Sequence, residues 1–447
     1  MEVEAVRDGA GQDGAGQNEP ARTARERPLR IHFVGAKGIP ATFGGVEHAV
    51  EEIGARLAAR GHRVVVHCRS HYTPAGLDTW RGMELRRETA VRTKRLDTLS
   101  HTFVGLAAAA RERPDVIGLH NYPNGVLAGV GRLARIPVVL HLHGFEWGLG
   151  KWNRLDKALL RALLRPATAA PTALTSVSRS QARFVREATG RRVVHIPNGV
   201  DPPAWIGDGG DAGGVGAIPL PADLRLERDG YLLCVSRLVP QKGVEHLIRA
   251  YRIARLPLPL VLVGDHNHAP EYAAKLRAEA GDDPGIRFAG YRFGDELWSL
   301  YAGCRLFVLP SESEGMPLVL LEAMAARCAT IATRIPEIED VGSDAIAYFD
   351  LGDAEDLARR MTALAGDRDA RERLGAAARA RALAAYSWDR VAEEYERLYR
   401  GLVRAAARAG RPLLLSGAAK GPRRTPGTPA GRHGPAGHAR VSSRHED

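Results

Sequence analysis

Two successive sets of alternating strand and helix patterns constrain the fold of this chain more than any other sequence feature. Short runs rich in valine, leucine and isoleucine alternate with longer stretches in which apolar residues recur at helical spacing. These runs are continuously apolar, which is typical of parallel strands buried on both faces. Because the alternation occurs before residue 200 and again after residue 230, it predicts an α/β protein with two doubly wound, Rossmann-like domains whose parallel sheets face each other across a cleft.

The pattern also predicts the individual elements. In the first half we expect strands at residues 29–34, 63–68, 115–120, 137–143, 173–178 and 192–196, and helices at 46–60, 124–134, 153–164 and 180–189. In the second half we expect strands at 231–235, 258–263, 286–289, 306–309, 330–333 and 345–349, separated by helical segments.

Composition divides the chain further. We expect a disordered N-terminal tail at 1–28, a first Rossmann-like domain at 29–200, a flexible Gly-, Asp- and Pro-rich linker at 201–229, a second Rossmann-like domain at 230–387, a further helix at 388–404, and a disordered basic tail at 405–447. Ser387 is the expected N-cap of the helix at 388–404.

Several protein classes are excluded by composition. The four cysteines, Cys68, Cys234, Cys304 and Cys328, are widely spaced, so neither a disulfide scaffold nor a zinc ribbon is expected. No apolar run reaches the roughly 18 residues of a membrane span, and no secretory signal is evident, so we expect a cytoplasmic protein. Much of the net charge of +11 lies after residue 402, and no nucleic-acid-binding motif is present, so no nucleic-acid partner is expected.

Two loops after predicted strands carry glycines and cations suited to an anionic ligand. Gly44 and Gly45 directly precede an amphipathic helix, whose first backbone amides are free to bind an anion. Arg237 and Lys242 follow the first strand of the second half in a loop that ends in glycine, and together they form a compact candidate phosphate site. Each motif is also compatible with an ordinary turn or a solvated loop. Neither a G-x-G-x-x-G fingerprint nor a P-loop is present.

A third loop, after the strand at 306–309, contains two glutamates. If the segment were helical, Glu322 would lie about 12 Å from Glu314, which approximates the distance between the sugar and the ribose of a nucleotide-diphosphate sugar. Either glutamate alone is equally compatible with an ordinary helix charge. Pro317 fits the first turn of the predicted helix, and the free amides near Met316 to Val319 would face the diphosphate between the two glutamates. The candidate donor-binding residues of this segment are Gly315, Met316, Pro317 and Leu318.

These motifs resemble a known family. SRLVPQKG at 236–243 and SESEGMPLVLLEAMA at 311–325 resemble the donor-site signature of retaining glycosyltransferases of family 4, which have the GT-B fold. GAKGIPATFGGVEHA from residue 35 and HGFEWGLGKWN at 143–153 resemble a bacterial polysaccharide-assembly subgroup that includes many rhamnosyltransferases. The chain departs from the subgroup pattern at Lys37, Phe43, Val46 and His143, which leaves the sugar and the acceptor open.

The resemblance implies that the domain at 29–200 is the acceptor side, that the domain at 230–387 binds the nucleotide sugar, and that the helix at 388–404 returns to the first domain. It also implies a role for each candidate residue. Arg237 and Lys242 would neutralise the leaving diphosphate, Glu322 would bind the ribose hydroxyls, and Glu314 would hold the donor sugar. Gly45 would bring its helix N-terminus to the donor, and His143 would lie near the sugar, with His120 as a weaker candidate. The implied donor is a nucleotide-diphosphate sugar, with deoxythymidine-diphosphate rhamnose leading. Since no D-x-D motif is evident, neither a metal nor a cofactor is expected.

A glycan or lipid-linked acceptor is implied in the same way. Residues 151–165 predict an amphipathic helix with Trp152, Leu155, Leu159 and Leu163 on one side and basic residues on the other. One interpretation is a helix packed on the core; the other is peripheral contact with anionic lipid at the inner face of the plasma membrane. Competing functions are an epimerase or phosphorylase of the same fold, and an inactive nucleotide-sugar-binding or scaffold subunit of a polysaccharide assembly complex.

Overall fold

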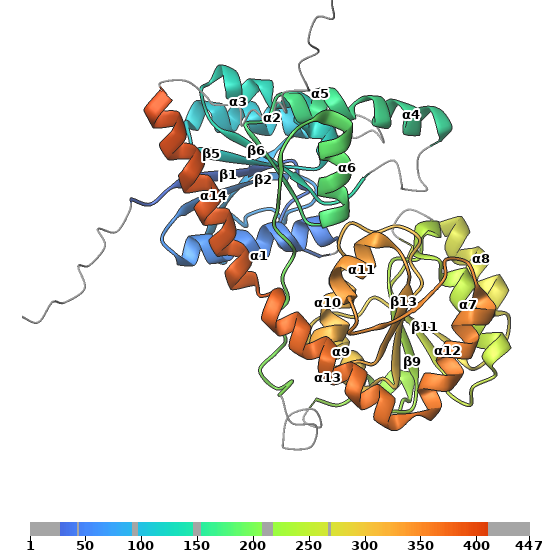
Figure 1. Cartoon of the computed structure of the whole chain (residues 1–447). Helices are drawn as coiled ribbons and strands as arrows, with labels where there is room; N and C mark the ends of the chain where they lie inside the picture. Colours follow the sequence, from blue (N-terminus) through green and yellow to red (C-terminus); the bar gives the residue numbers. More distant parts are fainter. Residues whose placement is uncertain are drawn as a thin grey trace, which may run out of the picture.

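The computed structural model of the chain describes residues 27–42, 44–91, 97–145, 153–207, 218–266 and 270–409. Most of both expected tails and the middle of the expected linker lie outside these residues. Within them the chain forms two parallel-sheet domains that contact each other (Figure 1). This confirms the predicted α/β class with two doubly wound, Rossmann-like domains.

The first sheet has eight strands in the order β3-β4-β2-β1-β5-β6-β7-β8. All neighbouring strands are parallel except β3 and β4, which form an antiparallel pair at one edge. The strands are β1 (Arg30–Val34), β2 (Arg63–Arg69), β3 (Thr79–Trp80), β4 (Met83–Glu88), β5 (Val116–His120), β6 (Val138–Leu142), β7 (Ala173–Ser176) and β8 (Val193–His195).

The second sheet has six parallel strands in the order β11-β10-β9-β12-β13-β14. They are β9 (Leu232–Val235), β10 (Leu260–Val263), β11 (Ile286–Gly290), β12 (Leu306–Leu309), β13 (Thr330–Thr333) and β14 (Ala347–Phe349). Strand order reverses between β9 and β12, which lie side by side at the centre. In a doubly wound sheet this is the position at which loops diverge and leave room for a ligand.

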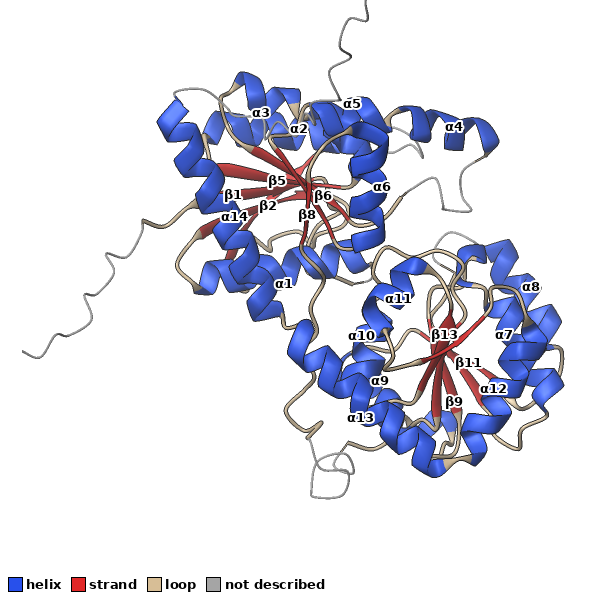
Figure 2. Cartoon of the chain, in the orientation of Figure 1, coloured by secondary structure: helices blue, strands red, loops and turns tan. Residues whose placement is uncertain are grey.

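Helices flank both sheets (Figure 2). The α-helices are α1 (Gly45–Ala59), α2 (Asp97–Glu112), α3 (Gly129–Leu133), α4 (Arg154–Ala162), α5 (Leu164–Ala169), α6 (Arg179–Thr189), α7 (Val244–Ala254), α8 (Pro270–Ala280), α9 (Gly294–Gly303), α10 (Leu318–Ala325), α11 (Pro336–Gly342), α12 (Ala354–Gly366), α13 (Arg368–Ala385) and α14 (Trp388–Ala409). Short 3₁₀ turns are η1 (Tyr122–Leu127), η3 (Ala222–Leu224) and η4 (Pro240–Lys242).

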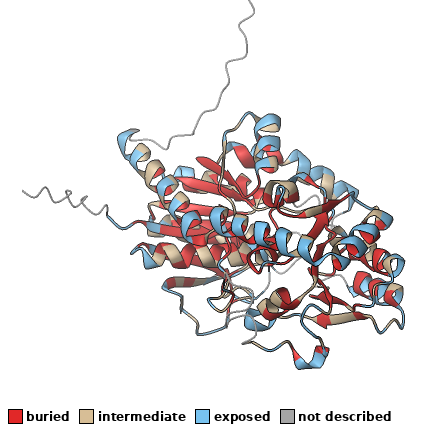
Figure 3. Cartoon of the chain, turned by 60° about the horizontal axis from the view of Figure 1, so that its bottom comes forward, coloured by how far each residue is buried: buried red, intermediate tan, exposed pale blue. Residues whose placement is uncertain are grey.

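Burial explains why the central strands are readable in the sequence. Every residue of β5, β6, β9, β10, β12 and β13 is buried, because helices cover both faces of these strands. The helices show alternating buried and exposed faces (Figure 3). The predicted strands at these positions are therefore confirmed, with ends that shift by one or two residues.

Three parts of the first domain differ from the sequence-based expectation. The strand β4, next to the edge strand β3, has partly exposed polar residues, so it and the following helix α2 lack the continuous apolar signal and were not predicted. The expected helix at 124–134 is a 3₁₀ turn followed by the short α3, because Gly125 packs tightly: a β-carbon there would lie 2.1 Å from the carbonyl oxygen of Ala167. The expected helix at 153–164 is divided into α4 and α5.

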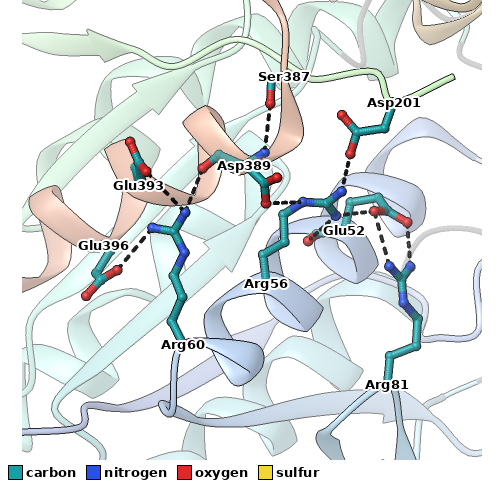
Figure 4. A network of polar contacts seen from close by, with 9 residues as sticks. All are labelled: Glu52, Arg56, Arg60, Arg81, Asp201, Ser387, Asp389, Glu393 and Glu396. Carbon is teal, nitrogen blue, oxygen red and sulfur yellow. Dashed lines mark hydrogen bonds and ion pairs between the residues drawn. The ribbon is translucent and has the colours of Figure 1, made fainter. Parts of the chain in front are cut away.

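The chain passes between the domains twice, and both crossings are tied to α1. The amide of Val200 on the first crossing donates to the carbonyl of Tyr386 on the second, at 2.6 Å. Arg56 of α1 pairs with Asp201 of the first crossing and, at 3.1 Å, with Asp389 of the second (Figure 4).

The helix after the second crossing is held by the first domain. Arg60, the C-cap of α1, donates to the carbonyl of Asp389 at 3.0 Å and pairs with Glu393 and Glu396 of α14 (Figure 4). The apolar face of α14, which includes Tyr395 and Tyr399, is buried in the core of the first domain. The last described helix therefore packs on the same domain that contains the first described residues.

Candidate active site where the two domains meet

One loop from each domain comes into backbone contact at the carboxyl ends of the two sheets. In the second domain, residues 310–317 lead from β12 to α10. A β-carbon built on Gly315 would lie 1.9 Å from the carbonyl oxygen of His143, just after β6 of the first domain. Any residue with a β-carbon at position 315 would clash with this oxygen. Gly315 therefore lets the two domains approach each other at the candidate site.

The loop cation Lys242 is paired with a glutamate from the neighbouring loop. Its amine lies 2.5 Å from Oε1 of Glu314, and the two side chains are only 12% and 7% exposed. Gly243, which follows, adopts a left-handed φ of 61° and passes so close to the next loop that a β-carbon would lie 2.2 Å from the carbonyl oxygen of Pro310. The loops after β9 and β12 are thereby joined by an ion pair and by close backbone packing.

The second predicted cation, Arg237, is placed differently. It follows β9, is half-buried, and its guanidinium makes no hydrogen bond or ion pair with any residue that the structure describes. An arginine that is partly withdrawn from water without an acidic partner is well suited to bind a phosphate.

Glu322 lies on α10, about one turn into the helix, and points to a different environment from that of Glu314. Its Oε2 accepts a hydrogen bond of 2.9 Å from the hydroxyl of Tyr301 on α9. Burial raises the pKa of the Glu322 carboxyl, while the nearby His48 and the Tyr301 hydroxyl lower it. His48 belongs to α1, so both domains contribute to the environment of this carboxylate.

Glu314 precedes the helix that carries Glu322, so the distance estimate that assumes a continuous helix between them does not apply. Pro317 is the N-cap of α10 with a ψ of 114°, so the helix begins at Leu318 and Glu314 lies in the preceding loop. The spacing therefore cannot be converted into a helical rise. Met316 contacts the first crossing instead: the side-chain amide of Asn198 donates to its carbonyl oxygen at 3.2 Å.

The glycine pair of the first domain lies against this second-domain helix. Gly44 caps α1 with a φ of 112°, a conformation that favours glycine, and the Glu47 carboxylate folds back to accept from the amide of Lys37 at 3.0 Å. A β-carbon on Gly45 would lie 3.5 Å from Cδ1 of Leu318. The N-termini of α1 and α10 thus meet at the domain boundary. Phe43 lies outside the described residues.

His143 is the end of a buried histidine cluster. Its Nε2 shares a hydrogen bond of 2.9 Å with Nδ1 of His120, whose ring stacks on His141 at a centroid distance of 4.6 Å. His141 in turn bonds to Thr175 at 2.9 Å and to the Tyr399 hydroxyl of α14 at 3.0 Å. Burial lowers the pKa of His143 to about 4, and burial together with the neighbouring histidines holds the pKa values of His120 and His141 well below their usual range, so the cluster is neutral at pH 7.

The N-terminus of α6 adds polar contacts that the sequence did not reveal. The amide of Ser180 donates to Oδ2 of Asp340 at 3.0 Å, and its hydroxyl donates to Oε1 of Glu337 at 3.1 Å, both on α11 of the other domain. The side-chain amide of Gln181 donates to the carbonyl oxygen of Glu314 at 3.4 Å. These residues lie in loops and helix starts without a recognisable motif, so only the three-dimensional arrangement identifies them.

The basic amphipathic helix is exposed on its apolar side. Lys151 and Trp152 lie outside the described residues, but within α4 no residue is buried, and Leu155 and Leu159 are 76% and 58% exposed. The predicted apolar side of this segment is therefore exposed at Leu155 and Leu159, while α4 packs on the core of the first domain through the partly buried Leu160.

Within the described ranges, no group of three or more histidine, cysteine, aspartate or glutamate side chains is arranged to hold a metal ion. Among the helices that the structure describes, none combines the length and apolar character needed to cross a bilayer.

Two family models match the chain, one in each domain. Residues 43–203 match Glycosyltransferase Family 4, and residues 221–381 match Glycosyl transferases group 1. The two matches, together with the two-sheet fold, identify this chain as a glycosyltransferase of the GT-B class.

Individual relatives span most of the chain or one domain of it. Alpha-maltose-1-phosphate synthase of Mycobacterium tuberculosis is 28% identical over 397 residues, which are 83% of this chain and 99% of the relative. O-antigen chain mannosyltransferase B of Escherichia coli is 28% identical over 148 residues, 32% of this chain and 39% of that protein. Among solved structures, HepE of Anabaena in complex with UDP and glucose superposes with a TM-score of 0.67 at 20% identity, covering 84% of this chain and 100% of that one.

Proposed function

We propose that this glycosyltransferase binds a nucleotide-diphosphate sugar between its two domains and transfers the sugar to a hydroxyl of a glycan or lipid-linked acceptor. The observation that carries the proposal is the pairing of Lys242 with Glu314 at the ends of β9 and β12, the switch point of the second sheet. A cation and a carboxylate held together there are suited to a ligand that carries both a diphosphate and sugar hydroxyls.

The remaining site residues extend this assignment. Arg237, with no protein partner among the described residues, binds a phosphate oxygen and stabilises the charge that develops on the leaving diphosphate. Glu322 binds the ribose hydroxyls with the carboxylate oxygen that Tyr301 does not occupy. The N-terminal amides of α10 and α1, beginning at Leu318 and Gly45, face the diphosphate from the two domains.

The transfer step that we propose retains the configuration of the anomeric carbon and needs no metal. The acceptor hydroxyl attacks from the face that the diphosphate leaves, and the departing phosphate oxygen takes the hydroxyl proton. His143, neutral at pH 7, accepts or donates a hydrogen bond to the donor sugar and carries no charge. Product of inverted configuration, determined by NMR, would contradict this mechanism.

The identity of the donor is proposed more broadly. Deoxythymidine-diphosphate rhamnose is the leading candidate from the sequence motifs, and uridine- or guanosine-diphosphate hexoses are the alternatives. Relatives named as a maltose-1-phosphate synthase and a mannosyltransferase, and a related structure that holds UDP and glucose, support a hexose donor equally well.

A matched binding experiment tests the donor site. Calorimetric titration with the deoxythymidine, uridine, guanosine and adenosine diphosphates should show binding by one series. Arg237→Ala and Glu322→Gln should each weaken that binding about tenfold or more. Arg359→Ala, which removes a surface arginine of α12 that pairs only with its own helix, should leave it unchanged. If no nucleotide or nucleotide sugar binds at millimolar concentration, the inactive scaffold subunit becomes the better assignment.

We also propose that the protein works at the inner face of the plasma membrane, held there by α4. The exposed Leu155 and Leu159 alternate with basic residues, which is the composition of a helix that lies in an anionic lipid surface. Flotation with phosphatidylglycerol vesicles should recover the protein, and high salt or Leu155→Ser with Leu159→Ser should release it. Leu133→Ser, at an exposed leucine elsewhere in this domain, is the control. Equal recovery with phosphatidylcholine vesicles would contradict the proposal.

A further inference from the structure

Two cysteines that are far apart in the sequence lie side by side next to the candidate donor site. Cys304 follows α9 and Cys328 precedes β13, and their sulfur atoms are 3.8 Å apart. Both are free thiols. Cys328 is only 4% exposed, whereas Cys304 is half-buried, so reagents reach the pair through Cys304.

Both thiols converge on one backbone carbonyl. Cys328 donates to the carbonyl oxygen of Tyr301 at 3.0 Å, and Cys304 donates to the same oxygen at 3.3 Å. Tyr301 is fully buried in the core of the second domain, with its ring against Phe307 and Trp298. The two thiols are therefore hydrogen-bonded to a residue that the core holds rigidly. The position of that residue also affects the candidate donor site.

The other end of Tyr301 reaches the carboxylate assigned to the donor ribose. Its hydroxyl donates to Oε2 of Glu322 at 2.9 Å. Cys328 is also linked directly to α10, the helix that carries Glu322, because the Cys328 amide donates to the carbonyl oxygen of Ala323 on that helix at 2.9 Å. Any movement of the two sulfurs thus acts on Glu322 along two short paths, one through Tyr301 and one through the end of α10.

We propose that Cys304 and Cys328 form a reversible regulatory disulfide that weakens donor binding by displacing Glu322. The effect on the donor rests on the proposed function; formation of the bond does not. Oxidation requires an external disulfide of low molecular weight, such as glutathione disulfide. The Cys304 thiolate attacks one of its sulfurs and releases one glutathione, and Cys328 then attacks the Cys304 sulfur and releases the second. Two thiols and one glutathione disulfide become one protein disulfide and two glutathiones.

The geometry predicts a structural consequence. A disulfide bond is about 2.05 Å long, so the sulfurs must approach each other by about 1.8 Å, and both hydrogen bonds to the Tyr301 carbonyl are lost. Because Tyr301 bridges this carbonyl and the Glu322 carboxylate, the change is transmitted to the ribose-binding group. Reduction restores both thiol donors.

Mass spectrometry of the full chain tests formation of the bond. After incubation with glutathione disulfide, the intact protein should lose about 2 Da, and a non-reduced digest should contain a peptide that links residues 304 and 328. Cys304→Ser, which keeps a hydroxyl donor for Tyr301, should abolish the cross-link. Cys68→Ser, at a buried cysteine of the first domain, should retain it. A stable glutathione adduct on Cys304 without a cross-link would overturn the proposal.

Nucleotide titration of the same samples tests the consequence. The oxidised wild type should bind the nucleotide diphosphate about tenfold more weakly than the reduced protein, and dithiothreitol should restore the affinity. Cys304→Ser should bind equally in both conditions. If the cross-link forms but affinity is unchanged, the regulatory role is wrong. If the reduced protein binds no nucleotide, the proposed function fails while the cross-link result stands.

Discussion

The amine of Lys242 and the carboxylate of Glu314 lie 2.5 Å apart, although the two residues belong to different loops and each has its own expected role toward the donor. The two side chains satisfy one another, so neither charge is left unpaired in a site that is largely withdrawn from water. Under the proposed function, a bound donor would redistribute this pair, with its phosphate competing for Lys242 and its sugar hydroxyls donating to Glu314.

A double-mutant cycle measures how strongly the pair is coupled. Lys242→Met alone and Glu314→Gln alone should each lower the free energy of unfolding by about 3 kcal/mol, because each leaves a mostly buried charge without a partner. The double variant should lose less than the sum, with a coupling of about 1–3 kcal/mol in urea unfolding. Additive losses would show that the pair does not stabilise the ligand-free site.

The approach of the two domains is tested at Gly315. Gly315→Ala places a methyl group on the carbonyl oxygen of His143, so the loops must separate. We expect kcat/KM to fall about 100-fold, since a shift of about 1 Å between reacting groups has that effect. Gly401→Ala, in α14 where no atom lies near the added carbon, is the matched control and should stabilise the helix slightly. Unchanged turnover in Gly315→Ala would mean that this contact is not part of the active state.

Much of the fold was predictable because its central strands are buried on both faces. In β9, β10 and β12 every residue is apolar and buried, and β13 differs only in its buried threonines Thr330 and Thr333, so the signal survives without knowledge of partners. It fails near the edge of the first sheet, where β4 carries Arg86 and Arg87 in contact with solvent. It fails again at η1, where tight packing of Gly125 replaces a regular helix with a 3₁₀ turn.

The candidate site was predictable only as a set of loops. Motifs placed Arg237, Lys242, Glu314 and Glu322 at the carboxyl edge of the second sheet, but spacing along the chain could not reveal that Lys242 and Glu314 pair. It also placed Pro317 in the first turn of the helix, whereas Pro317 is the N-cap and α10 begins at Leu318. The histidine cluster and the two adjacent cysteines arise from residues on separate elements, so only tertiary structure brings them together.

The stability of the protein should depend on pH through the histidine cluster. The pKa of His143 is lowered by burial from 6.5 to about 4, so between these values the unfolded chain binds a proton that the folded protein does not. Stability therefore falls as pH decreases through this window. His143→Asn should reduce the slope of unfolding free energy against pH by up to about 1.4 kcal/mol per pH unit.

The unfolding free energies at each pH are measured with urea as the denaturant, because guanidinium chloride would screen the charges of the protein. Because desolvation is the cause of the shift, the difference in slope between His143→Asn and wild type should persist at high salt. A slope difference of opposite sign would show that His143 is protonated in the folded protein.

The two crossings between the domains should depend on Arg56. This side chain, 17% exposed, bonds to Glu52 of its own helix and to Asp201 and Asp389 of the two crossings (Figure 4). Arg56→Met leaves three carboxylates around an apolar side chain, and their mutual repulsion adds to the lost bonds. We expect a loss of about 2–3 kcal/mol in urea unfolding, larger than for any isolated surface pair because one guanidinium serves several partners. Arg360→Met, which breaks a single i,i+4 pair on α12, should cost less than about 0.5 kcal/mol. Equal effects of the two substitutions would mean that the crossings are held by backbone and apolar contacts alone.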